Sequence, residues 1–175
     1  MSMHVLRAVD RAATAWKNGG GVTREIITFP LGAGMDAFDW RISIADVTSP
    51  GDFSRFEDVD RVLTVLEGRL SLDFVEEGRI VTLDVGQPFA FPGDVPIYGI
   101  PVGATVRDFN VMVRRSVGRA HVEAWRPDGD ADGTRIALSI APSSTLHLYD
   151  ALLLDPGETP PDDFTGYTVR FDSVR

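Results

Sequence analysis

Apolar and polar residues alternate over short stretches along most of this chain, which is the pattern of half-buried β-strands. No window of a dozen residues keeps apolar side chains at helical spacing without an interrupting glycine or proline. Clusters of Gly, Pro, Asp and Ser separate the alternating stretches, as turns do. The segments expected to form strands are 3–8, 22–29, 39–47, 61–67, 69–75, 79–85, 88–91, 104–114, 120–125, 134–140, 145–154 and 166–172. About a dozen short strands predict an antiparallel sandwich, jelly roll or barrel.

One stretch predicts its own pairing. In "LSLDFVEEGRIVTLDV", Leu70, Leu72 and Phe74 lie on one face of a strand, and alternation resumes at Val81 after a turn that contains Gly78. This is the pattern of a β-hairpin. Two segments are predicted loops instead: residues 126–133, "RPDGDADG", are rich in turn formers, and residues 155–166 contain prolines that exclude a central strand.

Charge and composition exclude several classes of function. The chain has 17 basic and 26 acidic residues and a net charge of −9, which opposes binding to nucleic acid. No stretch approaches the ~18 apolar residues of a membrane span, and charges scattered through the first fifteen residues do not form a secretory signal, so we expect a cytoplasmic protein. Cysteine is absent, and the three histidines are far apart in sequence. We therefore expect no metal site and no cofactor.

The run of three glycines in "WKNGGGVTREI", residues 16–26, is the first candidate for a site. Its lysine precedes the glycines and a strand follows them, whereas phosphate loops have the lysine after the glycines and then a helix. Two interpretations stay open. The backbone N–H groups could converge on an anion, or the glycines could form a sharp turn or bulge in a barrel wall.

The strand after the glycines separates two charged neighbours. Alternation places Arg24 on one face with Val22, and Glu25 on the other face with Thr23. Unless a bulge intervenes, only one of the two charges can point into a given pocket.

Two further strands carry polar residues on one face. In "WRISIADV", Arg41, Ser43 and Ala45 alternate with bulky apolar residues, and this small polar face either lines a cavity or faces water. In "RDFNVMVR", residues 107–114, one face carries the following side chains: Asp108, Asn110, Met112 and Arg114. A carboxylate, an amide and a guanidinium in register could bind a small polar ligand, but a solvated outer face has the same pattern.

Arg61 is the most informative single residue. The stretch that ends at Gly68, with the later Gly86 and Pro92, resembles the two motifs of cupins, but the metal-ligand positions of those motifs carry no histidine here. A guanidinium in a metal-free cup suits a carboxylate ligand. The alternative is a salt bridge with Asp58 or Asp60.

Four stretches in order, "WKNGGGVTREI", "WRISIADV", "FSRFEDVDRVLTVLEG" and "VRDFNVMVRR", closely resemble the HutD/Ves family of cupin-like proteins, and the resemblance extends from about residue 4 to residue 115. It implies an all-β, cupin-like jelly roll with two packed antiparallel β-barrels, as in bicupins. It further implies one compact unit over residues 1–175, with the main motifs at about 16–115 and a C-terminal β portion at about 116–175.

The resemblance also implies a function in bacterial histidine utilisation. The expected activity is regulatory and non-catalytic binding of a small carboxylate, with N-formylglutamate as the candidate ligand. The shared motif positions, which the resemblance implies as ligand-binding residues, are Trp16, Asn18, Gly19, Gly20, Gly21, Thr23, Arg24, Glu25, Arg61, Asp108, Asn110, Met112 and Arg114.

Two alternatives remain at this level. The first is a metal-independent isomerase, lyase or hydrolase acting on a histidine-pathway intermediate, with Glu25 or Asp108 as general base and Arg61 as electrostatic partner. The second is a stress-related, Ves-like interaction protein in which the glycine run lies at an interface. For the interaction protein we expect a homodimer, since barrels leave exposed strand faces that suit two-fold association.

Overall fold

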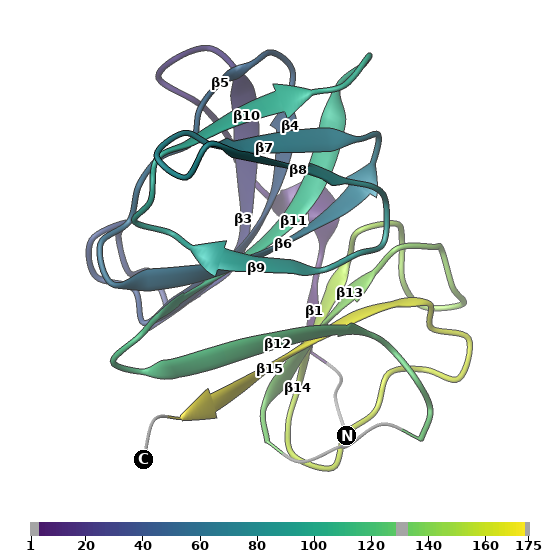
Figure 1. Cartoon of the computed structure of the whole chain (residues 1–175). Coiled ribbons are helices and arrows are strands. Elements are labelled where there is room, and N and C mark those ends of the chain that lie inside the picture. The colour runs from purple at the N-terminus through teal and green to yellow at the C-terminus, as the bar shows by residue number, and fades with distance from the viewer. Residues whose placement is uncertain (1–3, 129–132, 174–175) are drawn as a thin grey trace. The chain divides into compact units, whose positions relative to one another are not determined.

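The computed structural model describes residues 4–128 and 133–173. Apart from one 3₁₀ turn at Ala8–Asp10, the regular elements in these residues are β-strands, and they form three sheets with antiparallel pairing (Figure 1). In the described residues, no helix combines the length and the apolar character needed to span a membrane. The predicted all-β, antiparallel fold class is confirmed.

The chain divides into two compact units. The N-terminal unit comprises Ala12–Val117, and the C-terminal unit comprises Gly118–Arg175 together with Met1–Arg11. The packing of two barrels against each other and the single compact unit, both expected from the sequence, stay predictions.

Two sheets build the N-terminal unit. The six-stranded sheet has the order β2 (Ala13–Ala15), β3 (Gly21–Phe29), β4 (Trp40–Val47), β11 (Val106–Arg114), β6 (Val59–Glu67) and β9 (Phe89–Pro92). The four-stranded sheet has the order β5 (Gly51–Asp52), β10 (Ile97–Pro101), β7 (Leu70–Phe74) and β8 (Arg79–Leu83).

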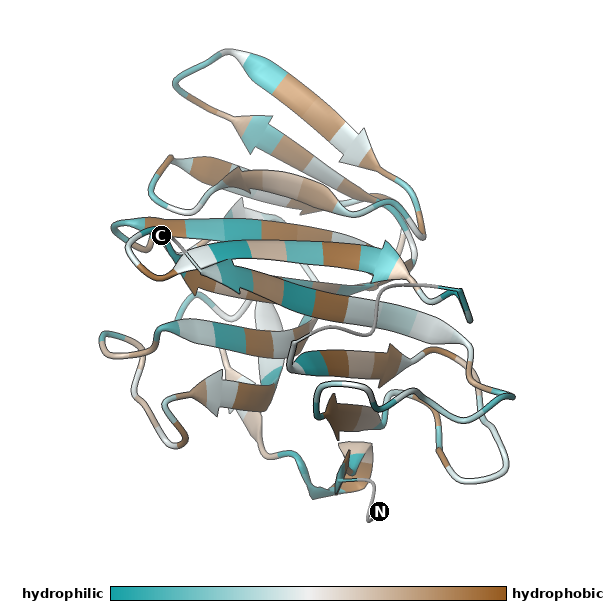
Figure 2. Ribbon diagram, turned by 90° about the horizontal axis from the view of Figure 1, so that it is seen from below, coloured by the Kyte–Doolittle hydropathy of each residue, from teal (hydrophilic) through white to brown (hydrophobic). Residues whose placement is uncertain are grey.

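The core of this unit joins its two sheets. Both contribute alternate apolar side chains to one buried cluster: Val47, Phe53, Leu63, Val65, Leu70, Leu72, Phe74, Leu83, Phe91, Ile97 and Val106. Figure 2 shows the corresponding pattern, with hydrophobic and hydrophilic residues alternating along several strands. Because successive side chains of a strand point to opposite faces, each sheet turns one face toward this core.

The C-terminal unit contains a single five-stranded sheet. Its order is β1 (His4–Leu6), β14 (Ala151–Leu154), β13 (Arg135–Ser139), β15 (Gly166–Ser173) and β12 (Gly118–Ala124). One face is covered by an apolar cluster of Ala137, Leu146, Leu152, Leu154 and Phe164. The first strand of the chain therefore pairs with β14, almost 150 residues later in the sequence.

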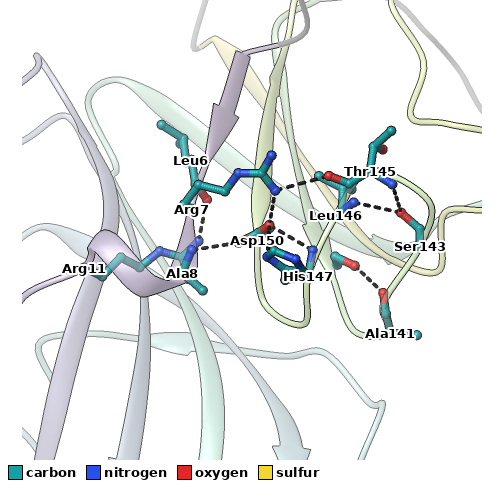
Figure 3. A network of polar contacts seen from close by, with 11 residues as sticks. Leu6, Arg7, Ala8, Arg11, Ala141, Ser143, Thr145, Leu146, His147 and Asp150 are labelled. Carbon is teal, nitrogen blue, oxygen red and sulfur yellow. Dashed lines mark hydrogen bonds and ion pairs between the residues drawn. The ribbon is translucent and has the colours of Figure 1, made fainter.

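Asp150 holds the N-terminal segment to this sheet (Figure 3). Its carboxylate, only 1% exposed, accepts hydrogen bonds from Arg7 Nη1 at 2.7 Å, from the Ala8 backbone N–H at 2.8 Å and from the His147 backbone N–H at 2.9 Å. Burial raises the pKa of Asp150, but these hydrogen bonds and the charge of Arg7 outweigh it, so the pKa lies below its usual value. The ionised, buried carboxylate therefore connects the residues after β1 to the turn before β14.

Each segment predicted as a strand contains one, and the predicted hairpin is present with Leu70 opposite Leu83. The segment 145–154 is a strand only from Ala151, because the residues before it form the turn around Asp150. Residues 155–165 contain no strand, as predicted. Residues 126–128 also lie outside strands, whereas 129–132 of that predicted loop fall outside the described residues.

Candidate functional site: a buried polar cluster in the N-terminal unit

Polar side chains occur on the inner face of the six-stranded sheet, the face that carries Leu63 and Val65 of the core. Strand register arranges this face in three rows. The first row contains Thr23, Ala45, Asp108 and Val65. The second contains Glu25, Ser43, Asn110 and Leu63. The third contains Arg41, Met112, Arg61 and Phe91. Asn110 therefore lies between the row of Asp108 and the row of Arg61.

Arg61 is surrounded by aromatic rings. Its side chain is buried, with the residue only 6% exposed, and the guanidinium carbon lies 5.2 Å from the ring centre of Phe91, 5.4 Å from that of Phe53 and 5.9 Å from that of Phe56. Contacts of this kind stabilise a cation through the ring quadrupole. They leave the N–H edges of the guanidinium available to a polar partner.

The hydrogen bonds of Arg61 are long. Its Nε donates to Asn110 Oδ1 at 3.4 Å and its Nη1 donates to the Ser54 backbone oxygen at 3.5 Å. Both distances exceed the usual 2.7–3.2 Å range, so these bonds are weak. Burial lowers the pKa of Arg61, to about 10, although the charge of Asp108 opposes this. At neutral pH the guanidinium is still charged.

The alternative interpretation of Arg61, a salt bridge with Asp58 or Asp60, is wrong. Asp60 accepts instead from Arg115 Nε at 2.7 Å, and Arg115 also binds Asp94 at 2.6 and 2.8 Å. Within the described residues, Arg61 forms no ion pair with any carboxylate. Since Asp60 and Arg61 are adjacent in a strand, their side chains point to opposite faces of the sheet.

Asp108 is the second unusual group of the cluster. It is only 1% exposed, and its Oδ1 has no hydrogen-bond partner among the described residues. Burial raises the pKa of Asp108 to about 7; the positive charge of Arg61 opposes this rise and the negative charge of Asp46 adds to it. Near neutral pH this carboxyl exchanges between its neutral and ionised forms.

Glu25 and Arg24 divide between the two faces, as alternation predicts. Glu25 lies on the inner face, where its carboxylate binds Arg41 Nε at 2.9 Å. Arg24 lies on the opposite face and pairs with Asp46 at 3.0 Å, and Asp46 also binds Arg107. A register shift between Glu25 and Ile27 comes after both charges, so it does not bring them together. Arg24 is therefore not part of the inner cluster.

The glycine run forms the turn between β2 and β3. The Trp16 N–H donates to the Gly21 oxygen at 2.9 Å, and the Gly19 N–H donates back to the Trp16 oxygen at 3.0 Å. The Gly20 N–H is bound by Asn18 Oδ1 at 2.9 Å, and Asn18 Nδ2 reaches the Asp52 oxygen at 3.4 Å. Gly19 has a φ of 73°, which favours glycine. The turn interpretation thus describes this segment, and the amides of Gly19 and Gly20 are already used within it.

Gly21 is glycine because its surroundings leave no room for a side chain. A Cβ atom there would lie 2.6 Å from the Asp46 backbone oxygen and 3.0 Å from the Trp16 ring. We expect Gly21→Ala to lower the free energy of unfolding by about 1–3 kcal/mol, since either the sheet or the ring must move. Urea denaturation measures this. Gly34→Ala is the matched control, because nothing lies within 4 Å of its added Cβ; equal stability of the two variants would contradict the steric explanation.

Trp16 and Thr23 border the cluster. The Trp16 Nε1 donates to Thr23 Oγ1 at 2.7 Å, and the indole ring lies edge-on to Phe53 with 5.8 Å between ring centres. Phe53 in turn contacts Arg61. The indole therefore supports the aromatic wall of the guanidinium.

Met112 and Arg114 differ in their surroundings. Met112 is buried beside Arg61 in the register and packs in a small cluster with Phe38 and Val59. Arg114 donates to the backbone oxygens of Phe38 at 3.2 Å and Asp36 at 3.3 Å, so it holds the loop between β3 and β4. The structure brings Arg61, Asp108, Asn110, Met112 and Glu25 onto one face, and leaves Arg114 at its edge.

Several residues of the cluster were missed as candidates. They are the ring residues Phe53, Phe56 and Phe91 and the inner-face residues Arg41 and Ser43. The alternation of "WRISIADV" is a usable signal for the last two, and the burial of Ser43 and Ala45 shows that the solvated alternative is wrong for this part of the face, where Arg41 is half-buried. It is also wrong for Asp108, Asn110 and Met112, which are buried. Nothing in the sequence indicates which phenylalanines meet Arg61.

The histidines lie outside this cluster, in the C-terminal unit. His4 is in β1, His121 in β12 faces Asp172 at 2.8 Å, and His147 is exposed in the turn before β14. Among residues 4–128 and 133–173, no three histidine, aspartate or glutamate side chains come together in a way that could hold a metal ion.

The chain is similar in sequence to proteins of a known family. The HutD family model matches residues 8–151. The chain belongs to the HutD family. The chain is 38% identical over 152 residues to an uncharacterized 21.2 kDa protein in the hutC 3′ region of Pseudomonas putida, covering 85% of this chain and 74% of the relative. It is 39% identical over 140 residues to the protein Ves of Citrobacter koseri, covering 79% and 72%.

Two solved structures are similar to this chain over nearly its whole length. HutD from Pseudomonas fluorescens SBW25, determined in a formate condition, superposes with a TM-score of 0.82 at 30% identity and covers 99% of this chain and 100% of the other. A conserved protein of unknown function from Pseudomonas aeruginosa PAO1 has a TM-score of 0.81 at 28% identity, with the same coverage. The resemblance recognised in the sequence is therefore confirmed.

Proposed function

We propose that this protein binds a small carboxylate at Arg61, without catalysis, and acts in the regulation of histidine utilisation. The single observation that supports this most strongly is the state of Arg61: a buried, charged guanidinium with only two long hydrogen bonds and no carboxylate in ion-pair contact within the described residues. A buried charge of this kind is costly unless it is paired. A ligand carboxylate can pair with the Arg61 guanidinium through two parallel charge-assisted hydrogen bonds.

The neighbours of Arg61 suit a small ligand. Phe53, Phe56 and Phe91 exclude water from the guanidinium, which strengthens its attraction for an anion. Asn110 offers an amide next to the guanidinium, and Ser43 offers a hydroxyl in the same row as Asn110. We propose that these groups orient the polar end of the ligand. Arg24 and the amides of Gly19 and Gly20 are left out of the proposed site because they have partners elsewhere.

The place in histidine utilisation is proposed from the family. One relative lies in the hutC 3′ region, and the family itself is HutD. N-formylglutamate is the candidate ligand because the resemblance implies it, and the position of the carboxylate at Arg61 is the part of the proposal that geometry supports.

Calorimetric titration tests the proposal. The protein is titrated with N-formylglutamate, glutamate, urocanate and formate, and at least one of them is expected to give saturable heat. The melting temperature rises with it, because a ligand at 100 times its dissociation constant stabilises the fold by about 2.7 kcal/mol. If none of the four gives either signal, the binding proposal is wrong.

A second candidate is a metal-independent enzyme with Asp108 as general base. The observation in its favour is a buried carboxyl whose pKa is about 7, a value suited to proton transfer at neutral pH. Glu25 suits this role less, because Arg41 already binds it. Incubation with histidine-pathway intermediates, followed by NMR, distinguishes the candidates: an enzyme converts one of them, and Asp108→Asn stops the conversion.

A third candidate is the interaction protein implied by the likeness to Ves. We propose in that case a homodimer. Light scattering of the purified chain measures its mass in solution, and a monomer at all concentrations would remove the homodimer from consideration.

A further inference from the structure

Four charged groups lie in the three rows of the inner face, and Arg114 lies at its edge, where it donates to the backbone oxygens of Phe38 and Asp36. Glu25 and Arg41 form an ion pair at 2.9 Å, so together they contribute no net charge. Arg61 and Asp108 remain, two rows apart on the same face with the row of Asn110 between them. When Asp108 is ionised, these four groups have no net charge; when Asp108 carries a proton, they have one net positive charge, that of Arg61.

The surroundings of Asp108 provide little support for its ionised form. Its cross-strand neighbours are Ala45 in β4 and Val65 in β6. The charged groups of β3, β4, β6 and β11 are Arg61, Arg41, Glu25 and Arg114 on the same face, and Arg24, Asp46, Asp60, Glu67 and Arg107 on the other. The strands of the facing sheet turn these apolar residues toward the interior: Leu70, Leu72, Phe74, Leu83 and Ile97. Arg61 is thus the main cation that acts on Asp108.

A ligand carboxylate at Arg61 would compete with Asp108 for this one positive charge. Two carboxylates near one guanidinium in a buried site repel each other strongly, and the usual result is that one of them takes up a proton. Asp108 is the group that can do so, because the ligand is held ionised by direct contact with Arg61. The neutral carboxyl would then have an O–H to donate, where Oδ1 now has no partner among the described residues.

We propose that the Arg61 site takes up a carboxylate together with one proton, and that the proton resides on Asp108. This inference rests on the proposed function and adds a specific role for Asp108. The site accepts an anion only when the Asp108 carboxyl is neutral. Binding therefore takes up one acid molecule in total: the carboxylate anion binds the guanidinium of Arg61, and the proton binds Asp108.

The direction of the pH dependence follows from linkage. Asp108 in the free protein has a pKa of about 7, and a bound anion raises it further. Well below pH 7, Asp108 is neutral with or without ligand, so the affinity does not change with pH. Above pH 7, each bound carboxylate must bring a proton from solution, and the dissociation constant is expected to rise about tenfold per pH unit.

Formate is the probe, because it does not titrate between pH 5.5 and 8.5 and carries no second polar group. Its dissociation constant is measured by calorimetry or NMR across that range for the full chain. At pH 8, titrations in HEPES and in Tris are compared, since these buffers differ in their heat of ionisation. The wild-type protein should show weaker binding as pH rises and an uptake approaching one proton per formate.

Asp108→Asn is the decisive variant, because asparagine has the shape of the neutral carboxyl. Formate should bind it with the same affinity at every pH and without proton uptake. Asp60→Asn is the matched control: Asp60 is on the opposite face of β6 and binds Arg115, so this variant should keep the wild-type pH dependence. Should Asp108→Asn fail to fold, the ¹³C signal of the Asp108 carboxyl in the wild-type protein replaces it, and formate should move its titration midpoint to higher pH.

The outcomes separate the inference from the function on which it rests. Saturable formate binding with a flat pH profile, or with no buffer-dependent heat at pH 8, overturns proton uptake while carboxylate binding stands. No formate binding at any pH, together with no binding of the other three acids, overturns both. A pH dependence that persists unchanged in Asp108→Asn assigns the proton to another group and also overturns the inference.

Discussion

The Arg61→Met variant is expected to lose carboxylate binding by about 100-fold or more while remaining folded. Hydrogen bonds to charged groups contribute about 1.5–3 kcal/mol each, so removing a bidentate contact costs at least about 3 kcal/mol of binding free energy. The methionine side chain is unbranched and apolar, which suits the surrounding rings of Phe53, Phe56 and Phe91 that now lie around the guanidinium. Calorimetry and thermal melting of the same sample measure both effects.

Stability is expected to change little in this variant. A buried arginine is a costly group, and its replacement by an apolar residue of similar volume is often neutral or stabilising. Asp108 would not become an isolated buried charge, because losing the charge of Arg61 raises its pKa further and favours the neutral form.

Arg24→Met is the control for the loss of an arginine as such. Arg24 is on the same sheet but on its other face, where it pairs with Asp46. This variant should bind carboxylate like the wild type. If Arg61→Met binds as tightly as Arg24→Met, the ligand is not held by Arg61.

The Asp150→Ala variant is expected to lower the free energy of unfolding by about 3–5 kcal/mol, because the carboxylate accepts three hydrogen bonds and a bond to a charged group contributes about 1.5–3 kcal/mol. The change leaves Arg7 without its carboxylate and leaves the N–H groups of Ala8 and His147 without an acceptor. Because these bonds connect the residues after β1 to the turn before β14, the first strand should lose protection from hydrogen exchange. Denaturant unfolding and hydrogen exchange measure the two effects.

The stability that Asp150 contributes is also expected to depend on pH. The pKa of Asp150 is lower in the folded chain than the ~3.9 of an unfolded aspartate, so its stabilisation is complete above that value and is lost as pH falls through the folded pKa. The difference between wild type and Asp150→Ala should therefore shrink on going from pH 7 to strongly acidic pH. Asp163→Ala is the control, since Asp163 is exposed and accepts only from Ser144; it should destabilise clearly less, and an equal loss would mean that burial is not what makes Asp150 important.

The strands that the sequence failed to predict are short or interrupted. β2 spans Ala13–Ala15 and β5 spans only Gly51–Asp52, while β10 contains Gly99 and ends at Pro101. Such segments have little alternation of their own. They become strands because β3, β7 and β10 offer them backbone partners, and tertiary structure commonly overrides weak local preference in this way.

The candidate site was partly accessible from the sequence for a related reason. Strand alternation is a local property, so it correctly separated Arg24 from Glu25 and placed Asp108 and Asn110 on one face. The family resemblance, carried by four motifs, supplied Arg61. Alternation does not show which face of a strand is buried, because that depends on the sheet that packs against it. The solvated alternative therefore stayed open until the structure showed that Asp108 is buried.

The sequence by itself determined the all-β class, most of the strands, the hairpin of β7 and β8 and the family. These follow from alternation, turn residues and motif order, which act over a few neighbouring residues. Only the tertiary structure decided that β1 pairs with β14, that the glycine run is a turn with its own hydrogen bonds, and that two phenylalanines of the loop after β5 and one of β9 enclose Arg61. The pairing of β1 with β14 and the contact of Phe91 with Arg61 depend on residues distant in the chain, and so does the raised pKa of Asp108, because burial by two sheets produces it. The hydrogen bonds of the glycine run are local, but glycine allows both a turn and an anion-binding loop, so the sequence left both interpretations open.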